Sequence, residues 1–189
     1  MAEHVILVAG PMGAGKTTAI QSLSEVPVVS TEAANTEIDR VNKATTTVAL
    51  DYGEISLDDT DKIRLYGVPG QRRFDFMWRI LEKRAVGLIV LVNNDTEQPL
   101  EEVTYFMNQF ASIHQRGGLV VGVTRSDLKA EPGIGDYLMH IEENGETHGM
   151  PIFTVDPRNR DHMVMMLFSL LTNIQSRAGA TDNVCLSQG

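Results

Sequence analysis

The stretch GPMGAGKTT, residues 10–18, constrains the fold of this chain more than any other part of its sequence. It matches the pattern G-x-x-x-x-G-K-[ST] and lies between an apolar run at residues 4–9 and a helical segment at residues 15–25. In that setting the glycines let several backbone N–H groups point inward, and the helix directs its positive end to the same place. The pattern therefore predicts a loop that binds phosphates; the alternative is a glycine-rich tight turn that only happens to contain a lysine.

Two residues of this loop have predicted chemical roles. Lys16 is expected to reach the β- and γ-phosphates of a nucleotide, and Thr17 is expected to place its hydroxyl on Mg²⁺. The nucleotide-binding residues predicted in the stretch are Gly10, Met12, Gly13, Ala14, Gly15, Lys16, Thr17 and Thr18. Kinases, ATPases and GTPases all use such a loop, so the loop alone does not identify the nucleotide.

Apolar runs and helical segments alternate along the rest of the chain. The apolar runs resemble strands buried on both faces of a parallel sheet and lie at residues 85–92, 118–124 and 151–155. The helical segments lie at residues 72–85, 99–117, 135–144 and 160–177. Residues 47–56 and 62–68 flank a polar turn and predict an antiparallel hairpin. The sequence therefore predicts a three-layer α/β P-loop NTPase fold, with a mostly parallel sheet and one antiparallel hairpin strand.

Length and charge limit the domain organisation and the partners. The chain has 189 residues, enough for one well-buried domain, which we predict at residues 1–177. The unpatterned tail at residues 178–189 is expected to be disordered. The formal net charge is -9 and the sequence has no basic stripe, so nucleic acid is not expected as a partner.

The sequence also bears on cellular location. Cys185 is the only cysteine and cannot form an internal disulfide, and the N-terminus carries Glu3 where a secretory signal would have basic residues. The longest apolar run is far shorter than the roughly 20 residues of a membrane-spanning helix. We therefore expect a cytoplasmic protein without direct membrane insertion, recruited to a membrane only through a partner.

The stretch VTRSDL is the first candidate for recognition of the base. It follows a buried strand with Thr124, Arg125 and Asp127, close to a T-K-x-D motif in which an aspartate reads guanine. A carboxylate accepts two hydrogen bonds from the ring N–H and amino group of guanine, and adenine has no matching edge. Arg125 stands in the lysine position, although the two side chains are not interchangeable. The alternative is that these residues only cap a helix.

A second base-contact loop is predicted at Asp156, Pro157 and Arg158, in the stretch TVDPRNRD. Proline has no N–H, so the backbone donor that usually contacts the guanine carbonyl is missing in this register. Arg158 or a shifted amide would then have to replace it. The alternative is that this stretch is simply the loop that begins a helix.

The order of GPMGAGKTT, ATTTVALDYGE, LYGVPGQRRF, VTRSDL and TVDPR resembles that of bacterial Ras-like small GTPases. The similarity is to the relatives of the gliding protein MglA, and most closely to the conservon-type GTPases of actinobacterial operons. It covers residues 4 to about 175. The resemblance implies a Ras-like fold, a signalling switch that alternates between GTP and GDP with Mg²⁺, and a roadblock/LC7-type protein as its regulator. It does not name the effector.

The resemblance also implies roles for the residues around the hairpin. In such proteins a threonine ahead of the hairpin closes over Mg²⁺ and the γ-phosphate, and among residues 45–47 Thr47 aligns with it. Alternatively, these threonines only begin a strand. Gln71, directly after the switch residue Gly70, matches the glutamine that orients the attacking water. Met12 replaces a glycine found in some relatives, and its bulk is expected to crowd Gln71 and slow unaided hydrolysis.

The chain departs from the Ras-like pattern at Gly67, where an aspartate ordinarily holds a water on Mg²⁺. That aspartate does not transfer the phosphate, so its loss weakens the outer shell of the metal more than it removes a reactant. Asp51 lies on the hairpin strand that is expected to pair beside Gly67, and it is a candidate replacement. The alternative is a carboxylate satisfied by the hairpin backbone or by solvent.

Together these features predict a GTPase that hydrolyses GTP to GDP slowly and is stimulated by a partner. Thr17 and Thr47 are the predicted metal ligands, Asp127 the guanine reader and Gln71 the catalytic residue. One alternative is a nucleotide-dependent scaffold that does not hydrolyse GTP, suggested by Gly67 and the bulk in the phosphate loop. The other is a small-molecule kinase, which would need an arginine-bearing lid, and no such lid is recognisable at residues 125–150.

Overall fold

A seven-stranded sheet lies at the centre of the computed structural model, counted over the residues that the structure describes, 3–32, 49–57, 61–71, 74–144 and 149–186. The strand order is β2-β3-β4-β1-β5-β6-β7. The bounds are β1 Glu3–Ala9, β2 Val29–Glu32, β3 Ala49–Ser56, β4 Lys62–Gly67, β5 Ala85–Asn93, β6 Leu119–Thr124 and β7 Ile152–Thr154. Strands β4, β1, β5, β6 and β7 pair in parallel, whereas β3 is antiparallel to both β2 and β4. The predicted mostly parallel sheet with an antiparallel hairpin is therefore confirmed.

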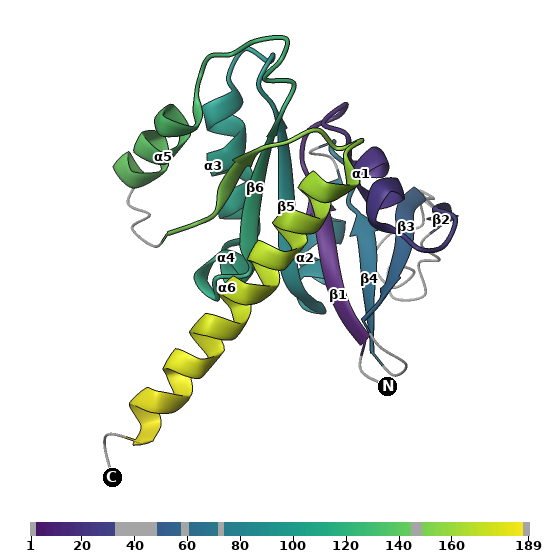
Figure 1. Ribbon diagram of the computed structural model, residues 1–189, viewed down its shortest axis with the longest axis vertical. Helices are drawn as coiled ribbons and strands as arrows, with labels where there is room; N and C mark the ends of the chain where they lie inside the picture. Colours follow the sequence, from purple (N-terminus) through teal and green to yellow (C-terminus); the bar gives the residue numbers. More distant parts are fainter. Residues whose placement is uncertain (1–2, 33–48, 58–60, 72–73, 145–148, 187–189) are drawn as a thin grey trace.

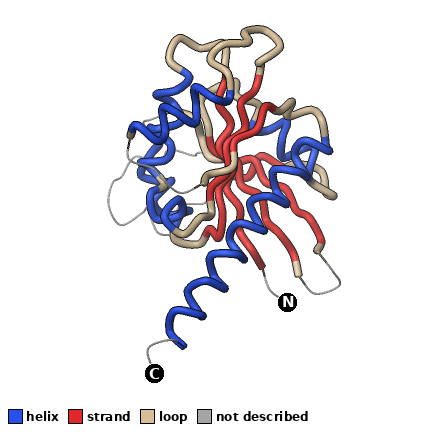
Figure 2. Tube along the Cα trace, turned by 60° about the vertical axis from the view of Figure 1, so that its left-hand side comes forward, coloured by secondary structure: helices blue, strands red, loops and turns tan. Residues whose placement is uncertain are grey.

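Helices cover both faces of the sheet (Figure 1, Figure 2). Their bounds are α1 Lys16–Leu23, α2 Asp75–Glu82, α3 Pro99–Gln109, α4 Ala111–Gln115, α5 Ile134–Glu143 and α6 Arg160–Leu186. Helices α1 and α6 share one buried cluster with Ile6, while α2 to α5 contribute to a second cluster that contains Leu7. Successive side chains of a strand point to opposite faces, so these two neighbours in β1 belong to different cores. This is the three-layer arrangement that the sequence predicts.

The helical segment predicted at residues 99–117 is divided in the structure. Phe110 lies between the end of α3 at Gln109 and the start of α4 at Ala111, and its backbone leaves the helical region with φ −115° and ψ 39°. Phe110 is fully buried, and its ring stacks on that of Trp78 with 5.6 Å between the centroids. The break therefore accompanies a contact between residues that lie far apart in the sequence, which helical periodicity does not reveal.

Two further differences concern the edges of the fold. Strand β2 is not predicted, because it is short and its Val29 is 54% exposed, so it has no buried apolar run. Helix α6 continues to Leu186, beyond the predicted end of the domain at residue 177, and leads away from the sheet in Figure 1. Extending an existing helix gains a backbone hydrogen bond for each residue without a new nucleation cost. A helix can therefore continue beyond the residues whose apolar side chains pack on the sheet.

Candidate nucleotide-binding site

The loop between β1 and α1 has the backbone that the phosphate-binding pattern requires. Gly10 and Gly15 have φ of 143° and 91°, a region that side-chain-bearing residues rarely adopt. A Cβ at Gly10 would lie 2.0 Å from the carbonyl oxygen of Leu91, and a Cβ at Gly15 would lie 2.7 Å from Cγ of Pro157. The loop is therefore held close both to β5 and to the loop that follows β7.

Lys16 lies beneath this loop. Its Nζ donates hydrogen bonds to the carbonyl oxygens of Gly10 at 2.9 Å and Pro11 at 2.7 Å. Burial lowers the pKa of Lys16 to about 8, and the negative charge of Asp51 partly opposes that shift. A buried ammonium with few charged partners is stabilised by a polyphosphate, so the position suits the predicted phosphate contact.

The carboxylate missing at Gly67 has a counterpart on the neighbouring strand. Asp51 pairs with Gly67 in the register of β3 and β4, as expected from the hairpin, and its Oδ2 accepts a hydrogen bond from the hydroxyl of Thr17. A Cβ at Gly67 would lie 3.1 Å from Cβ of Asp51 and 3.0 Å from Cδ1 of Ile20. The glycine therefore leaves room for the Asp51 side chain.

The pair Thr17 and Asp51 is suited to Mg²⁺. Hydroxyl and carboxylate oxygens are hard ligands of the kind that Mg²⁺ prefers, and in nucleotide sites the phosphates complete the shell. Over the described residues, no group of three or more histidine, cysteine, aspartate or glutamate side chains is arranged to hold a metal.

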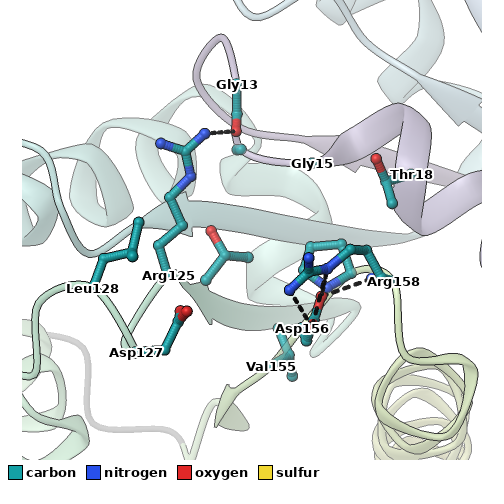
Figure 3. A pocket seen from close by; sticks show the side chains of 12 residues that line it. Gly13, Gly15, Thr18, Arg125, Asp127, Leu128, Val155, Asp156 and Arg158 are labelled. Carbon is teal, nitrogen blue, oxygen red and sulfur yellow. Dashed lines mark hydrogen bonds and ion pairs between the residues drawn. The ribbon is translucent and has the colours of Figure 1, made fainter.

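A cavity of about 400 Å³ adjoins the phosphate loop (Figure 3). Three loops form it, those that follow β1, β6 and β7. Its lining residues are Gly13, Ala14, Gly15, Thr18, Thr124, Arg125, Asp127, Leu128, Val155, Asp156, Pro157 and Arg158. All but Leu128 and Val155 are predicted from the sequence. These two apolar residues adjoin predicted ones, which is the signal that could have found them.

The loop after β6 is tied to the phosphate loop by Arg125. Its Nη2 donates to the carbonyl oxygen of Gly13 at 3.1 Å, and its Nη1 forms an ion pair with Asp95 at 3.0 Å. Thr124 is buried, and its hydroxyl donates to the carbonyl oxygen of Val92 in β5 at 3.0 Å, so it links β6 to the neighbouring strand. Asp127 is exposed on the cavity wall (Figure 3). Thr124, Arg125 and Asp127 therefore have three different structural environments, although they are close in the sequence.

The loop after β7 uses its own backbone donors. The N–H of Asp156 donates to Nδ1 of His162 at 3.1 Å, and the N–H of Arg158 donates to Oδ1 of Asp156 at 2.9 Å. Hydrogen bonds from the side chain of Arg158 are the main cause that holds the pKa of Asp156 below its usual range. Sequence reasoning missed His162, six residues beyond Asp156, because nothing local marks a helical histidine as a cap.

The segment after β4 packs against the phosphate loop. A Cβ at Gly70 would lie 2.7 Å from the carbonyl oxygen of Gly10, which explains the glycine by close backbone approach. Gln71 is half-buried beside it, and Met12 is 71% exposed. The predicted metal ligand Thr47 lies outside the described residues.

Residues 27–150 match the model of a family described as "Conserved hypothetical ATP binding protein". The chain belongs to this family. The match includes Asp51, Gln71 and Asp127, and ends before the loop that follows β7.

One curated relative and one solved structure extend the comparison. The "uncharacterized protein MJ1339" of Methanocaldococcus jannaschii is 33% identical over 90 residues, 47% of this chain and 51% of that protein. The similarity thus spans about half the length of the relative. The G domain of the T. maritima FeoB iron transporter superposes with a TM-score of 0.59 at 16% identity, over 94% of this chain and 99% of that domain. That likeness shows the fold, which is the fold of a G domain.

Family and fold together make this chain a P-loop nucleotide-binding protein. Among the described residues, no helix has both the length and the apolar composition needed to cross a bilayer.

Proposed function

We propose that the protein is a small GTP-binding switch that hydrolyses GTP to GDP with Mg²⁺. The observation behind this proposal is that the carboxylate of Asp127 lines the same cavity as the phosphate loop. Guanine presents two donors to such a carboxylate, and adenine presents none that match. At about 1.5 to 3 kcal/mol for each hydrogen bond to a charged group, Asp127 favours GTP over ATP by several kcal/mol.

The proposed hydrolysis uses residues on the other side of the phosphate loop. Thr17 and Asp51 would hold Mg²⁺, with Thr47 as the ligand expected from the sequence. When bound, Mg²⁺ would stabilise the negative charge of the phosphates. Lys16 stabilises the same charge, and Gln71 orients the attacking water. The close approach of Gly70 to Gly10 supports this role, because it brings the Gln71 segment against the loop.

The proposed switch involves residues 30–50 and 67–80, which rearrange when the γ-phosphate is lost. Trp78 supports this idea, since its Nε1 donates to the carbonyl oxygen of Pro69 at 3.1 Å and so connects the buried core to the segment before Gln71. A roadblock/LC7-type regulator that stimulates hydrolysis, and a cytoplasmic location with recruitment to a membrane through a partner, belong to the same proposal.

ATP binding is the second candidate function. The family description names ATP, and Pro157 removes one backbone donor from the loop where guanine-specific proteins use one. A non-hydrolysing scaffold would differ from the switch only in the chemical step, so the two are separated by kinetics.

Competitive calorimetry of GTP, GDP and ATP with Mg²⁺ tests the choice of nucleotide. We expect GDP and GTP to bind at least about 100-fold more tightly than ATP. Asp127→Asn should abolish that preference and bind xanthosine diphosphate instead, because the asparagine amide donates to the xanthine oxygen that replaces the amino group. Equal affinities for ATP and GTP would contradict the proposal, and single-turnover hydrolysis with a regulator would separate the switch from the scaffold.

A further inference from the structure

The loop after β7 has no backbone donor left for a base. Pro157 lacks an N–H, and those of Asp156 and Arg158 are bonded within the loop, to His162 and to Asp156 respectively. The next N–H, that of Asn159, donates to the carbonyl oxygen of Asp156 at 3.0 Å. Any donor that this loop offers to a base must therefore come from a side chain.

Arg158 provides that donor. Its Nε and Nη2 bind the carboxylate of Asp156 at 2.9 Å each, while its Nη1 has no hydrogen-bond partner among the described residues. The side chain is 79% exposed and lines the cavity together with Asp127 (Figure 3). The guanidinium thus has free N–H groups at the wall of the base cavity.

We propose that Arg158 reads the carbonyl oxygen at position 6 of guanine, and that Asp156 is the residue that positions it. The inference rests on the proposed function, because it takes the bound base to be guanine. Asp127 accepts from the ring N–H and the amino group, and Arg158 donates to the adjacent oxygen. The base is recognised along its whole edge by two side chains of opposite charge.

The two side chains discriminate in the same direction. Adenine has an amino donor where guanine has the carbonyl oxygen, so the Arg158 guanidinium would face another donor instead of an acceptor. Adenine also presents a ring acceptor to Asp127, where guanine has an N–H. A guanidinium and a carboxylate at this edge therefore both favour guanine.

The loop holds Arg158 in place before any base binds. Pro157 has a restricted φ and packs against Gly15, where an added Cβ would lie only 2.7 Å from Cγ of Pro157. Asp156 holds Arg158 by both backbone and side chain, and His162 in turn fixes the backbone of Asp156. In order of size, the hydrogen bonds of Asp156, its charge, and a smaller contribution from Asp127 raise the pKa of Arg158. A side chain already held by an ion pair loses less conformational freedom on binding a ligand than an unpaired one does.

Base analogues test the proposal directly by calorimetry. GDP is compared with 2-aminopurine riboside diphosphate, which keeps the amino group but has hydrogen in place of the oxygen at position 6 and, as a result, no N–H at the neighbouring ring nitrogen. We expect the wild-type protein to bind the analogue at least about 100-fold more weakly than GDP, because the analogue lacks both the acceptor for Arg158 and the ring donor for Asp127. In Arg158→Ala the ratio between the two ligands should fall by about 10- to 100-fold, and the preference that remains is due to Asp127.

Two further variants complete the design. Asp156→Ala should lower the ratio between GDP and the analogue, and Asp156→Asn should retain part of it, because asparagine still accepts from the backbone and side chain of Arg158. Arg116→Ala is the matched control: it removes an arginine that donates to Ser112 and Ala85 and lies outside the cavity lining, so the ratio should not change.

The possible failures are distinguishable. If Arg158→Ala keeps the full wild-type ratio, a different donor reads the oxygen and the inference is wrong, even though GDP is still preferred to ADP. If Arg158→Ala weakens GDP, ADP and the analogue by the same factor, the guanidinium stacks on the base and does not read it. If ADP binds the wild-type protein as tightly as GDP, the proposed function itself fails.

Discussion

Exchanging the residues at positions 51 and 67 tests whether the metal-site carboxylate has moved from β4 to β3. Asp51 and Gly67 face each other in the hairpin, and a Cβ at position 67 would lie 3.0 to 3.1 Å from side-chain atoms of Ile20 and Asp51. Gly67→Asp therefore adds an overpacked side chain, at about 1 to 3 kcal/mol, and a second carboxylate. Two carboxylates about 4 Å apart repel by about 1 kcal/mol in bulk water and about 4 kcal/mol near a protein surface.

The single variant Gly67→Asp should thus lose about 2 to 7 kcal/mol of unfolding free energy in urea denaturation. The single variant Asp51→Gly removes the carboxylate that contacts Thr17. The factor by which Mg²⁺ raises the affinity for GDP should therefore fall by about 10- to 100-fold. The double variant has one carboxylate and one glycine again. We expect it to recover stability relative to Gly67→Asp, with a coupling free energy of at least about 1 kcal/mol, and to recover part of the Mg²⁺ dependence.

Urea denaturation and calorimetry with and without Mg²⁺ give both readouts on the same samples. Asp51→Asn is a control that keeps the shape of the side chain and removes its charge, so it should affect Mg²⁺ dependence but not packing. The reasoning is refuted if Asp51→Asn leaves Mg²⁺ dependence unchanged, or if the double variant is no more stable than Gly67→Asp.

Three further predictions concern the phosphate loop and its neighbours. The pKa of Lys16 is about 8 in the folded chain and 10.5 in the reference state. Between these values the unfolded chain binds more protons, so the unfolding free energy should rise by about 1 to 2 kcal/mol from about pH 8 to about pH 9.5. Denaturation curves should show no such rise for Lys16→Met, and an equal rise would exclude this origin. Gly15→Ala should lose more unfolding free energy and more nucleotide affinity than Gly13→Ala. Both glycines have positive φ, but only at Gly15 would the new Cβ meet Pro157, 2.7 Å away. Equal losses in the two variants would show that packing against the proline is unimportant. Gln71→Ala should slow single-turnover GTP hydrolysis by about 10- to 100-fold without changing GDP affinity, and an unchanged rate would remove its catalytic role.

Much of the fold follows from local sequence patterns. The apolar run at residues 85–92 becomes β5, and the polar turn between the two halves of the hairpin sets an antiparallel pair. From that pair alone Asp51 is expected beside Gly67, because the register of a hairpin is set by its own turn and hydrophobic alternation. Local patterns succeed here because the interactions that decide them occur between residues close in sequence.

The remaining features depend on contacts between different helices, strands and loops, which local sequence patterns do not predict. Phe110, at the break between α3 and α4, packs its ring on Trp78, and β2 pairs with the edge of β3. The role proposed for Arg158 depends on His162 and Asp156, whose side chains accept the hydrogen bonds of two backbone N–H groups in the loop after β7. Such contacts form only after the elements assemble, so no window of sequence contains them.

The sequence by itself determined the phosphate loop and its place between a strand and a helix, because glycine torsions and helix polarity are local properties. It also supplied the side chains on which base recognition is proposed to depend. Only the tertiary structure decided which of them share a cavity: the parallel sheet brings the loops after β1, β6 and β7 to one edge, where residues more than 100 positions apart come into contact. The carboxyl ends of parallel strands meet at one edge of a sheet, and the chain order of those strands does not specify their neighbours.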